Sequence, residues 1–434
     1  LSGHPALKAV SPQAPILDWF KGDDVHHNGA FMLLDLYSFA SYMFKRHDNP
    51  LTEDHGLPSP IGEDAYEWFL EMKTPAALTA ALPDTLAFWN EVLLHPDYDE
   101  YWQERSLEPH LKDISPAILV VGGEFDTDDC YGALNTYKLI HENSPETDLH
   151  LVYGPWTHGG WHESDYQGLG TRKFGEGLST YFMKNIEYPF FRYYLENKGK
   201  RPEPVYVFAS GSDEWQTMDV WPSDDIAFTP MYLSGGKSLS ADAPSEEESS
   251  SCYVSDPHDP VPFMEDASRR DKSYMVADQS FASARNDVLT FVSDELEETL
   301  KLEGPLKAEL EMEISSTDAD VIVKLIDVHP DGYQMLVRGE VFPARYRYSL
   351  SDPQPVEPGK PFRVDFTMND IAHWVLPGHR LMVQIQSSCF PLVNMNPQTF
   401  MDNIYEADEK DYVKSEITVY HQQDKPSRIL LPVR

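Results

Sequence analysis

Residues 117–129 read Ala-Ile-Leu-Val-Val-Gly-Gly-Glu-Phe-Asp-Thr-Asp-Asp, and this stretch decides the fold. It opens on a continuous apolar run, without polar alternation, which is typical of a parallel strand buried on both faces. A segment with helical spacing follows at about residues 131–143, and a second strand follows at residues 148–153. Strand, helix and strand at this spacing predict a βαβ unit, which implies a parallel sheet.

The sequence on either side of this unit predicts different structures. Before it, residues 7–15 predict one short strand, and the segment after Trp19 has helical spacing with few strand signals. After it, residues 175–199 predict a long helix, and short alternating strands such as residues 204–208 and 380–386 follow between turn residues. We expect an α/β core with a helical cap insertion and a C-terminal all-β domain, either a sandwich or a jelly roll. The expected boundaries are 1–18 for the first part of the core, 19–112 for the cap, 113–203 for the rest of the core and 204–434 for the β domain.

The composition limits the classes of partner. A length of 434 residues predicts two or three domains. The formal net charge of −38 repels phosphate backbones, so we expect no nucleic-acid partner. No apolar run is long enough to predict a membrane span.

The cysteines predict neither a zinc site nor a disulfide framework, because Cys130, Cys252 and Cys389 are odd in number and far apart. We expect no cofactor. The cysteines leave the compartment open, and we favour a periplasmic or secreted protein over a cytoplasmic one. The first residues resemble the end of a helix running into a buried strand, so we expect the sequence to start inside a domain.

Two polar residues follow consecutive strands of the predicted sheet. Asp126 follows the strand at 117–121, and His158 follows the strand at 149–153. Reactive groups of open α/β sheets gather beyond the carboxyl ends of the strands. An acid followed by a histidine is also the chain order of the last two members of an α/β-hydrolase triad. Asp126 is therefore the candidate catalytic acid and His158 the candidate general base.

The third member of such a triad should be a serine in a Gly-x-Ser-x-Gly turn. No such pentapeptide occurs in residues 1–434. The chain order requires the serine before Asp126. We therefore expect it a short distance upstream of Leu1.

Each signal has a structural alternative. Asp126 can be a helix N-cap, as Asp128 or Asp129 can, and His158 can be an ordinary loop histidine. A zinc site of His158, His162 and Glu163 is disfavoured, because the intervening glycines at 159–160 do not suit the helix that such a motif needs. A second polar cluster at residues 23–28 can ligate a metal or form a hydrogen-bonded junction between cap and core, and we favour the junction. We expect no metal site.

Several motifs resemble the family that includes cocaine esterase, α-amino acid ester hydrolases, glutaryl acylase-like enzymes and X-Pro dipeptidyl-peptidases. They are residues 2–9, 123–126, 154–158, 325–332 and 377–381. The resemblance covers nearly the whole chain and implies an α/β-hydrolase core, a helical cap and a C-terminal jelly roll. It implies the acid role for Asp126 and the base role for His158, and it leaves the nucleophile and the oxyanion-hole donors without a counterpart. It also suggests a homo-oligomer.

The resemblance extends to substrate recognition. Residues 95–102 are similar to the α-amino acid ester hydrolases near a carboxylate cluster that holds the substrate's ammonium group. Asp99 matches one acid of that cluster, whereas Tyr98 stands where a second acid is expected. The neighbours Asp97 and Glu100 are further candidates for substrate binding, as is Trp156 in the loop before His158. The alternative is that the acids near Asp99 are solvated residues at a helix end.

The predicted function is a serine-type acyl hydrolase that cleaves a small ester or amide through an acyl-enzyme. An X-Pro dipeptidyl-peptidase is the alternative within the same chemistry. A non-catalytic jelly-roll module that binds glycan or protein is the alternative of another class.

Overall fold

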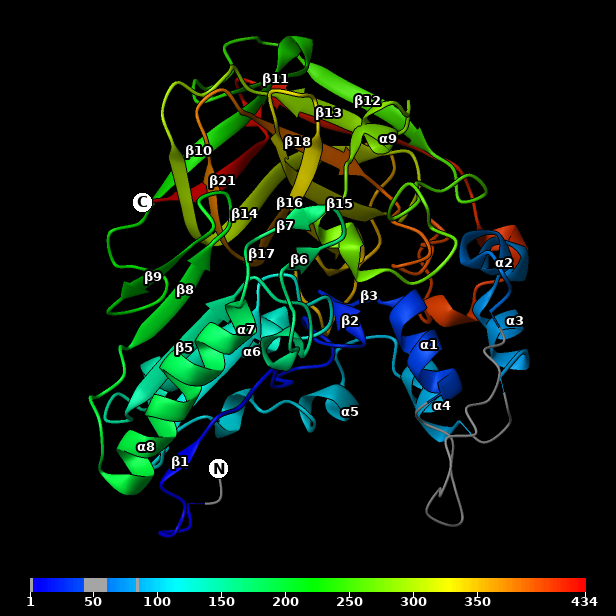
Figure 1. Ribbon diagram of the computed structural model, residues 1–434. Coiled ribbons are helices and arrows are strands. Elements are labelled where there is room, and N and C mark those ends of the chain that lie inside the picture. Colours follow the sequence, from blue (N-terminus) through cyan, green and yellow to red (C-terminus); the bar gives the residue numbers. More distant parts are fainter. Residues whose placement is uncertain (1–2, 43–60, 83–85) are drawn as a thin grey trace.

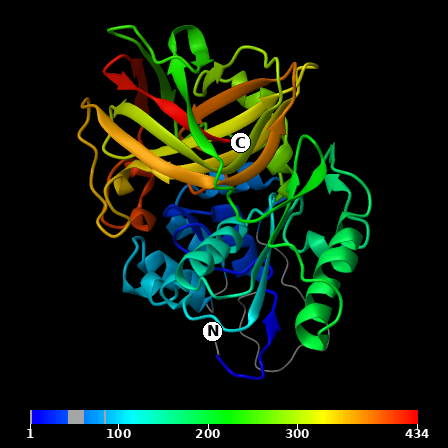
Figure 2. The same ribbon diagram turned by 90° about the vertical axis from the view of Figure 1, so that its left-hand side faces the viewer.

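The computed structural model describes residues 3–42, 61–82 and 86–434 (Figure 1). The expected α/β core and C-terminal β domain are confirmed, and Figure 2 shows the β domain lying over the core. Residues 1–2 lie outside the described residues, and Ser2 is the first residue of the first predicted motif; residues 43–60 and 83–85 of the predicted cap also lie outside.

The core is a five-stranded sheet in the order β1-β4-β5-β8-β9. Its strands are β1 (Ala9–Val10), β4 (Ala117–Gly123), β5 (Leu149–Gly154), β8 (Val205–Ala209) and β9 (Glu214–Met218). The first four are parallel, and β9 is antiparallel to β8. Every residue of β4 is buried, as expected of its continuous apolar run.

One strand expectation is wrong. The strand at 204–208 was assigned to the β domain, but β8 pairs in parallel with β5, with Leu151 opposite Val205. The sequence Val-Tyr-Val-Phe-Ala of β8 is buried along its whole length, so Tyr206 does not mark a polar face. A strand buried on both faces carries no alternation, and this one belongs to the parallel sheet.

Helices complete the core. Helix α6 (Cys130–Asn143) connects β4 to β5. The connection from β5 to β8 contains α7 (Leu178–Phe182), a π-helical turn at Met183–Glu187 and α8 (Tyr188–Glu196).

The described part of the predicted cap is mainly helical. Its helices are α1 (Leu33–Tyr42), α2 (Ala65–Met72), α3 (Pro75–Ala80), α4 (Ala87–Leu94) and α5 (Glu100–Gln103). They follow a short hairpin of β2 (His26–His27) and β3 (Ala30–Phe31). Its turn is Asn28-Gly29, with φ of 50° and 82°, and this residue pair suits a turn that needs two left-handed residues.

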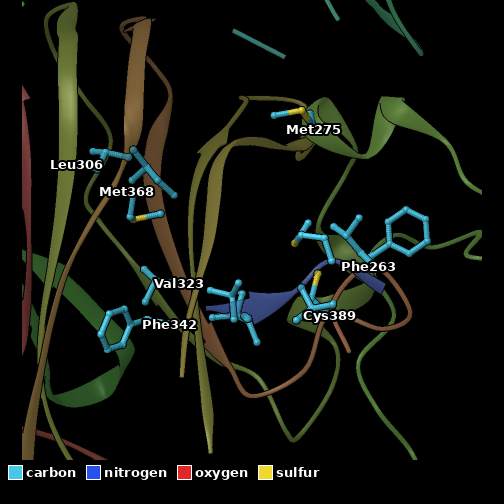
Figure 3. Packing of buried hydrophobic residues seen from close by; sticks show 14 of the residues in the cluster. Phe263, Met275, Leu306, Val323, Phe342, Met368 and Cys389 are labelled. Atoms are coloured by element: carbon cyan, nitrogen blue, oxygen red, sulfur yellow. The ribbon is translucent and has the colours of Figure 1, made fainter. Parts of the chain in front are cut away.

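The β domain forms one sheet of 12 strands. They are β10 (Ala227–Ser234), β11 (Ser238–Ser240), β12 (Ser250–Ser255), β13 (Leu289–Val292), β14 (Leu300–Ile314), β15 (Asp320–Val328), β16 (Gln334–Pro343), β17 (Phe362–Val375), β18 (Arg380–Gln386), β19 (Ser415–Gln422), β20 (Lys425–Pro426) and β21 (Arg428–Val433). A short helix, α9 (Ser280–Ser283), precedes β13. The buried apolar side chains include Leu306 and Met368, which face each other across β14 and β17 (Figure 3).

A buried arginine joins the β domain to the core. Arg338 of β16 donates hydrogen bonds to the carbonyl oxygens of Glu124 and Asp370, at 2.9 and 3.0 Å. The Glu124 side chain accepts a hydrogen bond from the backbone N–H of Ala372 in β17, at 3.0 Å. The loop after β4 is therefore held from the β-domain side. Among the described helices, none is long and apolar enough to span a bilayer.

Candidate active site

Two loops at the carboxyl ends of β4 and β5 bring Asp126 and His158 together. The backbone N–H groups of Glu124 and Phe125 donate to the carbonyl oxygens of Gly154 and Trp156, at 2.8 and 3.1 Å, so the loops are bonded to each other. A Cβ at Gly123 would lie 2.2 Å from the Trp156 carbonyl oxygen, and the close approach therefore requires glycine.

The imidazole of His158 faces two carboxylates. Its Nδ1 lies 3.0 Å from Oδ2 of Asp129 and 3.3 Å from Oδ2 of Asp126. Both acids are buried, whereas the His158 side chain is 46 % exposed. The arrangement fixes one ring nitrogen and leaves the other edge of the ring accessible, which is the geometry that a general base needs.

Asp126 has a second role in the same loop. Its Oδ1 accepts the backbone N–H groups of Asp128 and Asp129, at 3.2 and 3.3 Å. Asp126 therefore accepts backbone N–H groups as a cap residue does, and it contacts His158 at the same time. Asp129 directly precedes α6 but makes no side-chain cap there, and its Oδ2 contacts His158 instead.

Further acids surround this pair, and Asp24, Asp126, Asp128 and Asp129 are called here the acidic cluster. The backbone N–H of Asp24 donates to the Asp128 carbonyl oxygen at 3.1 Å. The Asp24 side chain accepts a hydrogen bond from the Trp19 indole at 3.0 Å. Arg270 lies 3.2 Å from Asp128 and also pairs with Asp35.

Burial and mutual repulsion change the ionisation of these groups. Interactions with Asp126 and Asp129 raise the pKa of His158 to about 10. Burial, together with the charges of Asp129 and Asp128, raises the pKa of Asp24 to about 7. Burial and the charge of Asp35 likewise raise the pKa of Asp128 to about 7, against the opposing effect of Arg270. At neutral pH Asp24 and Asp128 are therefore partly protonated, and an added cation would favour their ionised forms.

The polar cluster at residues 23–28 is divided between two roles. Asp23 accepts the backbone N–H groups of Leu17, Asp18 and Gly132, at 2.8, 2.9 and 2.7 Å, and so joins the start of the cap to α6. This is the hydrogen-bonded junction that the sequence favoured. Asp24, one residue later, belongs to the acidic cluster.

The acids predicted to bind substrate lie elsewhere. Asp99 caps α5 through the backbone N–H of Tyr101, at 3.0 Å, and pairs with His95 at 2.5 Å. Asp97 accepts the Tyr346 hydroxyl at 2.9 Å, and Glu100 is an exposed residue of α5. Within the described residues, none of these acids bonds to His158 or the acidic cluster. Asp99 thus lies at a helix end, and the substrate-binding role of the three acids stays a prediction.

Trp156 is also placed differently from expectation. Its side chain is fully buried and packs edge-on against Phe182. It belongs to the loop that carries His158, and its buried ring anchors that loop in the protein interior.

Two sets of residues near His158 contain the side-chain types that bind metal ions. His162 and Glu163 do not converge with it, because His162 belongs to a single 3-10 turn and pairs with Glu187 at 3.2 Å. Ligand atoms of Asp126, Asp128 and His158 do lie within 4.8 Å of one another. That set shares Asp126 and His158 with the ion-paired arrangement, so an ion bound there would compete with it.

The sequence predicts only part of the acidic cluster. It suggests a helix cap for Asp129, although the position of Asp129 beside Asp126 also indicates a place in the site. Asp24 and Arg270 come from segments about a hundred residues or more away from Asp126 along the chain, and no local pattern marks them.

Two family models match most of the chain. Residues 1–160 match the family model of the X-Pro dipeptidyl-peptidase (S15 family). Residues 191–430 match the model of the X-Pro dipeptidyl-peptidase C-terminal non-catalytic domain.

Individual relatives are similar over most of the chain. Cocaine esterase from Rhodococcus sp. (strain MB1 Bresler) is 32 % identical over 363 residues, which cover 79 % of this chain and 61 % of that protein. A crystal structure of an aminopeptidase from a marine sediment archaeon, Thaumarchaeota archaeon, is 31 % identical with a TM-score of 0.92, covering 99 % of this chain and 73 % of that one. An α-amino acid ester hydrolase structure is 33 % identical with a TM-score of 0.92, covering 100 % of this chain and 74 % of that one. The chain thus spans less than two thirds of the cocaine esterase length.

Proposed function

The chain belongs to the X-Pro dipeptidyl-peptidase (S15) family, and on this basis we propose that the full-length protein is a serine-type hydrolase of small esters or amides whose acyl group carries a free α-amino group. The observation that carries the proposal is the acidic cluster packed around a half-exposed histidine. The histidine supplies the base of an acyl transfer, and the acids supply a site for a cation.

The chemistry assigns one task to each described residue. His158 takes the proton of a serine hydroxyl as that oxygen attacks the substrate carbonyl carbon. It then returns the proton to the departing alcohol or amine as the bond to the acyl carbon breaks, which leaves an acyl-enzyme. Water repeats the two steps and releases the acid. Asp126 and Asp129 hold Nδ1 and stabilise the imidazolium that forms.

The proposal requires a nucleophile that the 434 residues do not contain in a Gly-x-Ser-x-Gly turn. We place it on a serine outside these residues, on the exposed side of the His158 ring.

The amino-group preference follows from charge. A substrate ammonium group placed among Asp24, Asp128 and Asp129 would favour their ionised forms and offset their mutual repulsion. A neutral acyl group of the same size would leave that repulsion in place. The names of the two similar structures, an aminopeptidase and an α-amino acid ester hydrolase, support the same substrate class.

Two other functions are the alternatives to this proposal. An X-Pro dipeptidyl-peptidase would use the same base and the same amine site but would require proline as the second residue of the substrate. A non-catalytic binding module would have no use for an imidazole held by two buried acids and exposed on its other edge.

A matched pair of substrates tests the proposal in the full-length protein. The p-nitrophenyl esters of alanine and propionic acid differ by the amino group alone. We expect the alanine ester to have a kcat/KM about ten- to a hundredfold higher, the value of one partly buried charge pair. Ala-Pro-p-nitroanilide tests the dipeptidyl-peptidase alternative.

Asp24→Asn should remove most of that preference while leaving the propionyl ester nearly unchanged. Asp99→Asn is the matched control, because it removes the same charge at a helix cap remote from the cluster's contacts. Equal turnover of the two esters would contradict the amine site, and no turnover of either would contradict the hydrolase.

A further inference from the structure

Two motifs of the β domain, at residues 325–332 and 377–381, meet in space without contributing to the site above. Strands β15 and β18 are antiparallel neighbours, with Asp327 opposite Leu381 and Val328 opposite Arg380. One more step in this register places His329 opposite His379, just beyond the two strand ends. Their ring centroids are 4.6 Å apart.

Three potential metal ligands share one face at this point. Residues two apart on a strand project to the same side, so Asp327 and His329 lie together there. The Asp327 carboxylate has Oδ1 2.7 Å from Nδ1 of His379 and Oδ2 3.8 Å from Nε2 of His329. One ligand atom from each residue lies within 4.8 Å of the others. In a tetrahedral zinc site, neighbouring ligand atoms are about 3.3 Å apart, between the two distances found here.

The surroundings hold these groups in place. His373 of β17 contacts Oδ2 of Asp327 at 3.0 Å and is buried, so it orients the carboxylate from behind. The backbone N–H of His329 donates to Tyr333, and the carbonyl oxygen of His379 accepts from Leu296, each at 2.8 Å. Fixed backbones on both sides reduce the ordering that a bound ion would require.

The two histidines are partly open to solvent. The side chains of His329 and His379 are 27 % and 13 % exposed, which leaves a path for an ion and a water.

We propose that Asp327, His329 and His379 bind one divalent transition-metal ion, for which Zn²⁺ is the test ion, with water completing the coordination. Two imidazoles and one carboxylate are a donor set that such ions accept. When His379 coordinates through Nδ1, the proton on that nitrogen moves to Nε2 through solvent, so the ring stays neutral. The bound ion links the turn after β15 to the turn before β18, and it is a structural ion of the β domain.

The experiment titrates metal-free full-length protein with Zn²⁺ by calorimetry, and with Co²⁺ by visible absorption. All variants carry His158→Ala, because Asp126, Asp128 and His158 form the other group of potential ligands in the described chain. In this background we expect one saturable site. His329→Ala should weaken it at least about a hundredfold, above the range that loss of an outer hydrogen-bond partner causes.

His379→Ala should weaken binding to the same extent. His258→Ala is the matched control, since it removes an exposed β-domain histidine that pairs only with Asp256 among the described residues. The His329 side chain makes no hydrogen bond within 3.5 Å in the described structure, so its variant should fold, which near-UV circular dichroism checks. No saturable binding in the parent, or unchanged affinity in either the His329 or the His379 variant, would overturn the site.

Discussion

The protein contains two histidine–aspartate pairs whose surroundings differ sharply. In the core, Nδ1 of His158 lies 3.0 and 3.3 Å from two carboxylates, while the side chain is 46 % exposed. In the β domain, Nε2 of His373 lies 3.0 Å from Asp327, Nδ1 lies 2.9 Å from the Ser210 hydroxyl, and the side chain is 1 % exposed.

The comparison shows that a histidine–carboxylate distance does not by itself indicate catalysis. Both nitrogens of His373 are satisfied inside the protein, so no proton can pass to a substrate. His158 has one nitrogen held and the other edge accessible. The free edge is the functional difference, and the predictions below test it together with the acids that surround it.

The largest expected effects come from replacing each of the two histidines, His158 and His373, with alanine. His158→Ala should lower kcat by about 10³-fold or more, because general-base activation is lost, with little change in stability. His373→Ala should instead destabilise the fold by about 3–5 kcal/mol, because it leaves the buried Asp327 without that partner. Stopped-flow or steady-state kinetics and urea unfolding of both variants give the test. A tenfold or smaller loss of kcat in His158→Ala would contradict the general-base role of His158.

The next effect concerns the two acids on His158. Asp126→Asn and Asp129→Asn should each lower kcat by about 10- to 100-fold, because the other carboxylate remains to orient the ring. The double variant should approach the loss of His158→Ala, since groups acting as a unit are not additive. If one single variant alone equals the double, the second acid has no part in orientation.

The pH dependence should distinguish His158 from an ordinary histidine. Its pKa of about 10 means that the free enzyme holds the protonated, inactive ring at neutral pH. The kcat/KM for a neutral ester should therefore rise with pH toward that value, and Asp129→Asn should move the rise to lower pH. Because the folded pKa lies above the ordinary 6.5, the stabilisation from this ion pair is complete below that pH and is lost as pH rises through about 10. A profile that levels off near 6.5 would contradict the two-acid environment.

The smallest expected effect is on stability. Asp24 has its pKa raised from 3.8 to about 7, so the folded protein binds more protons than the unfolded chain between these values and loses stability as pH rises. Asp24→Asn should raise Tm by a few degrees at pH 8 and leave it unchanged near pH 3. Asparagine can still accept from Trp19 and tolerates the φ of 30° at this position. Scanning calorimetry at the two pH values decides, and an equal shift at both would point to a cause other than charge.

The sequence predicted those features that depend on short stretches of chain. A continuous apolar strand, a short loop and a polar residue were enough to select Asp126 and His158, which the structure places in contact. It failed where neighbours in sequence face different ways: Trp156 lies two residues before His158, yet it is fully buried. It also missed residues that tertiary folding brings to the site from distant segments of the chain, as for Asp24 and Arg270. Asp99 was selected by resemblance of a short segment, and in the structure its Oδ1 caps α5 while its Oδ2 pairs with His95.

Arg338 has a consequence for the way the molecule opens. Its guanidinium bonds to the carbonyl of Glu124 at the start of the loop that carries Asp126, and to Asp370 in the β domain. Separating the two parts would break the bond to Glu124 and leave a buried cation and a carbonyl without that partner, which is costly. Local fluctuations of that loop are therefore tied to the larger motion of undocking the β domain. In a hydrogen-exchange experiment, the amides of the loop and of β16 should exchange together, as one cooperative unit.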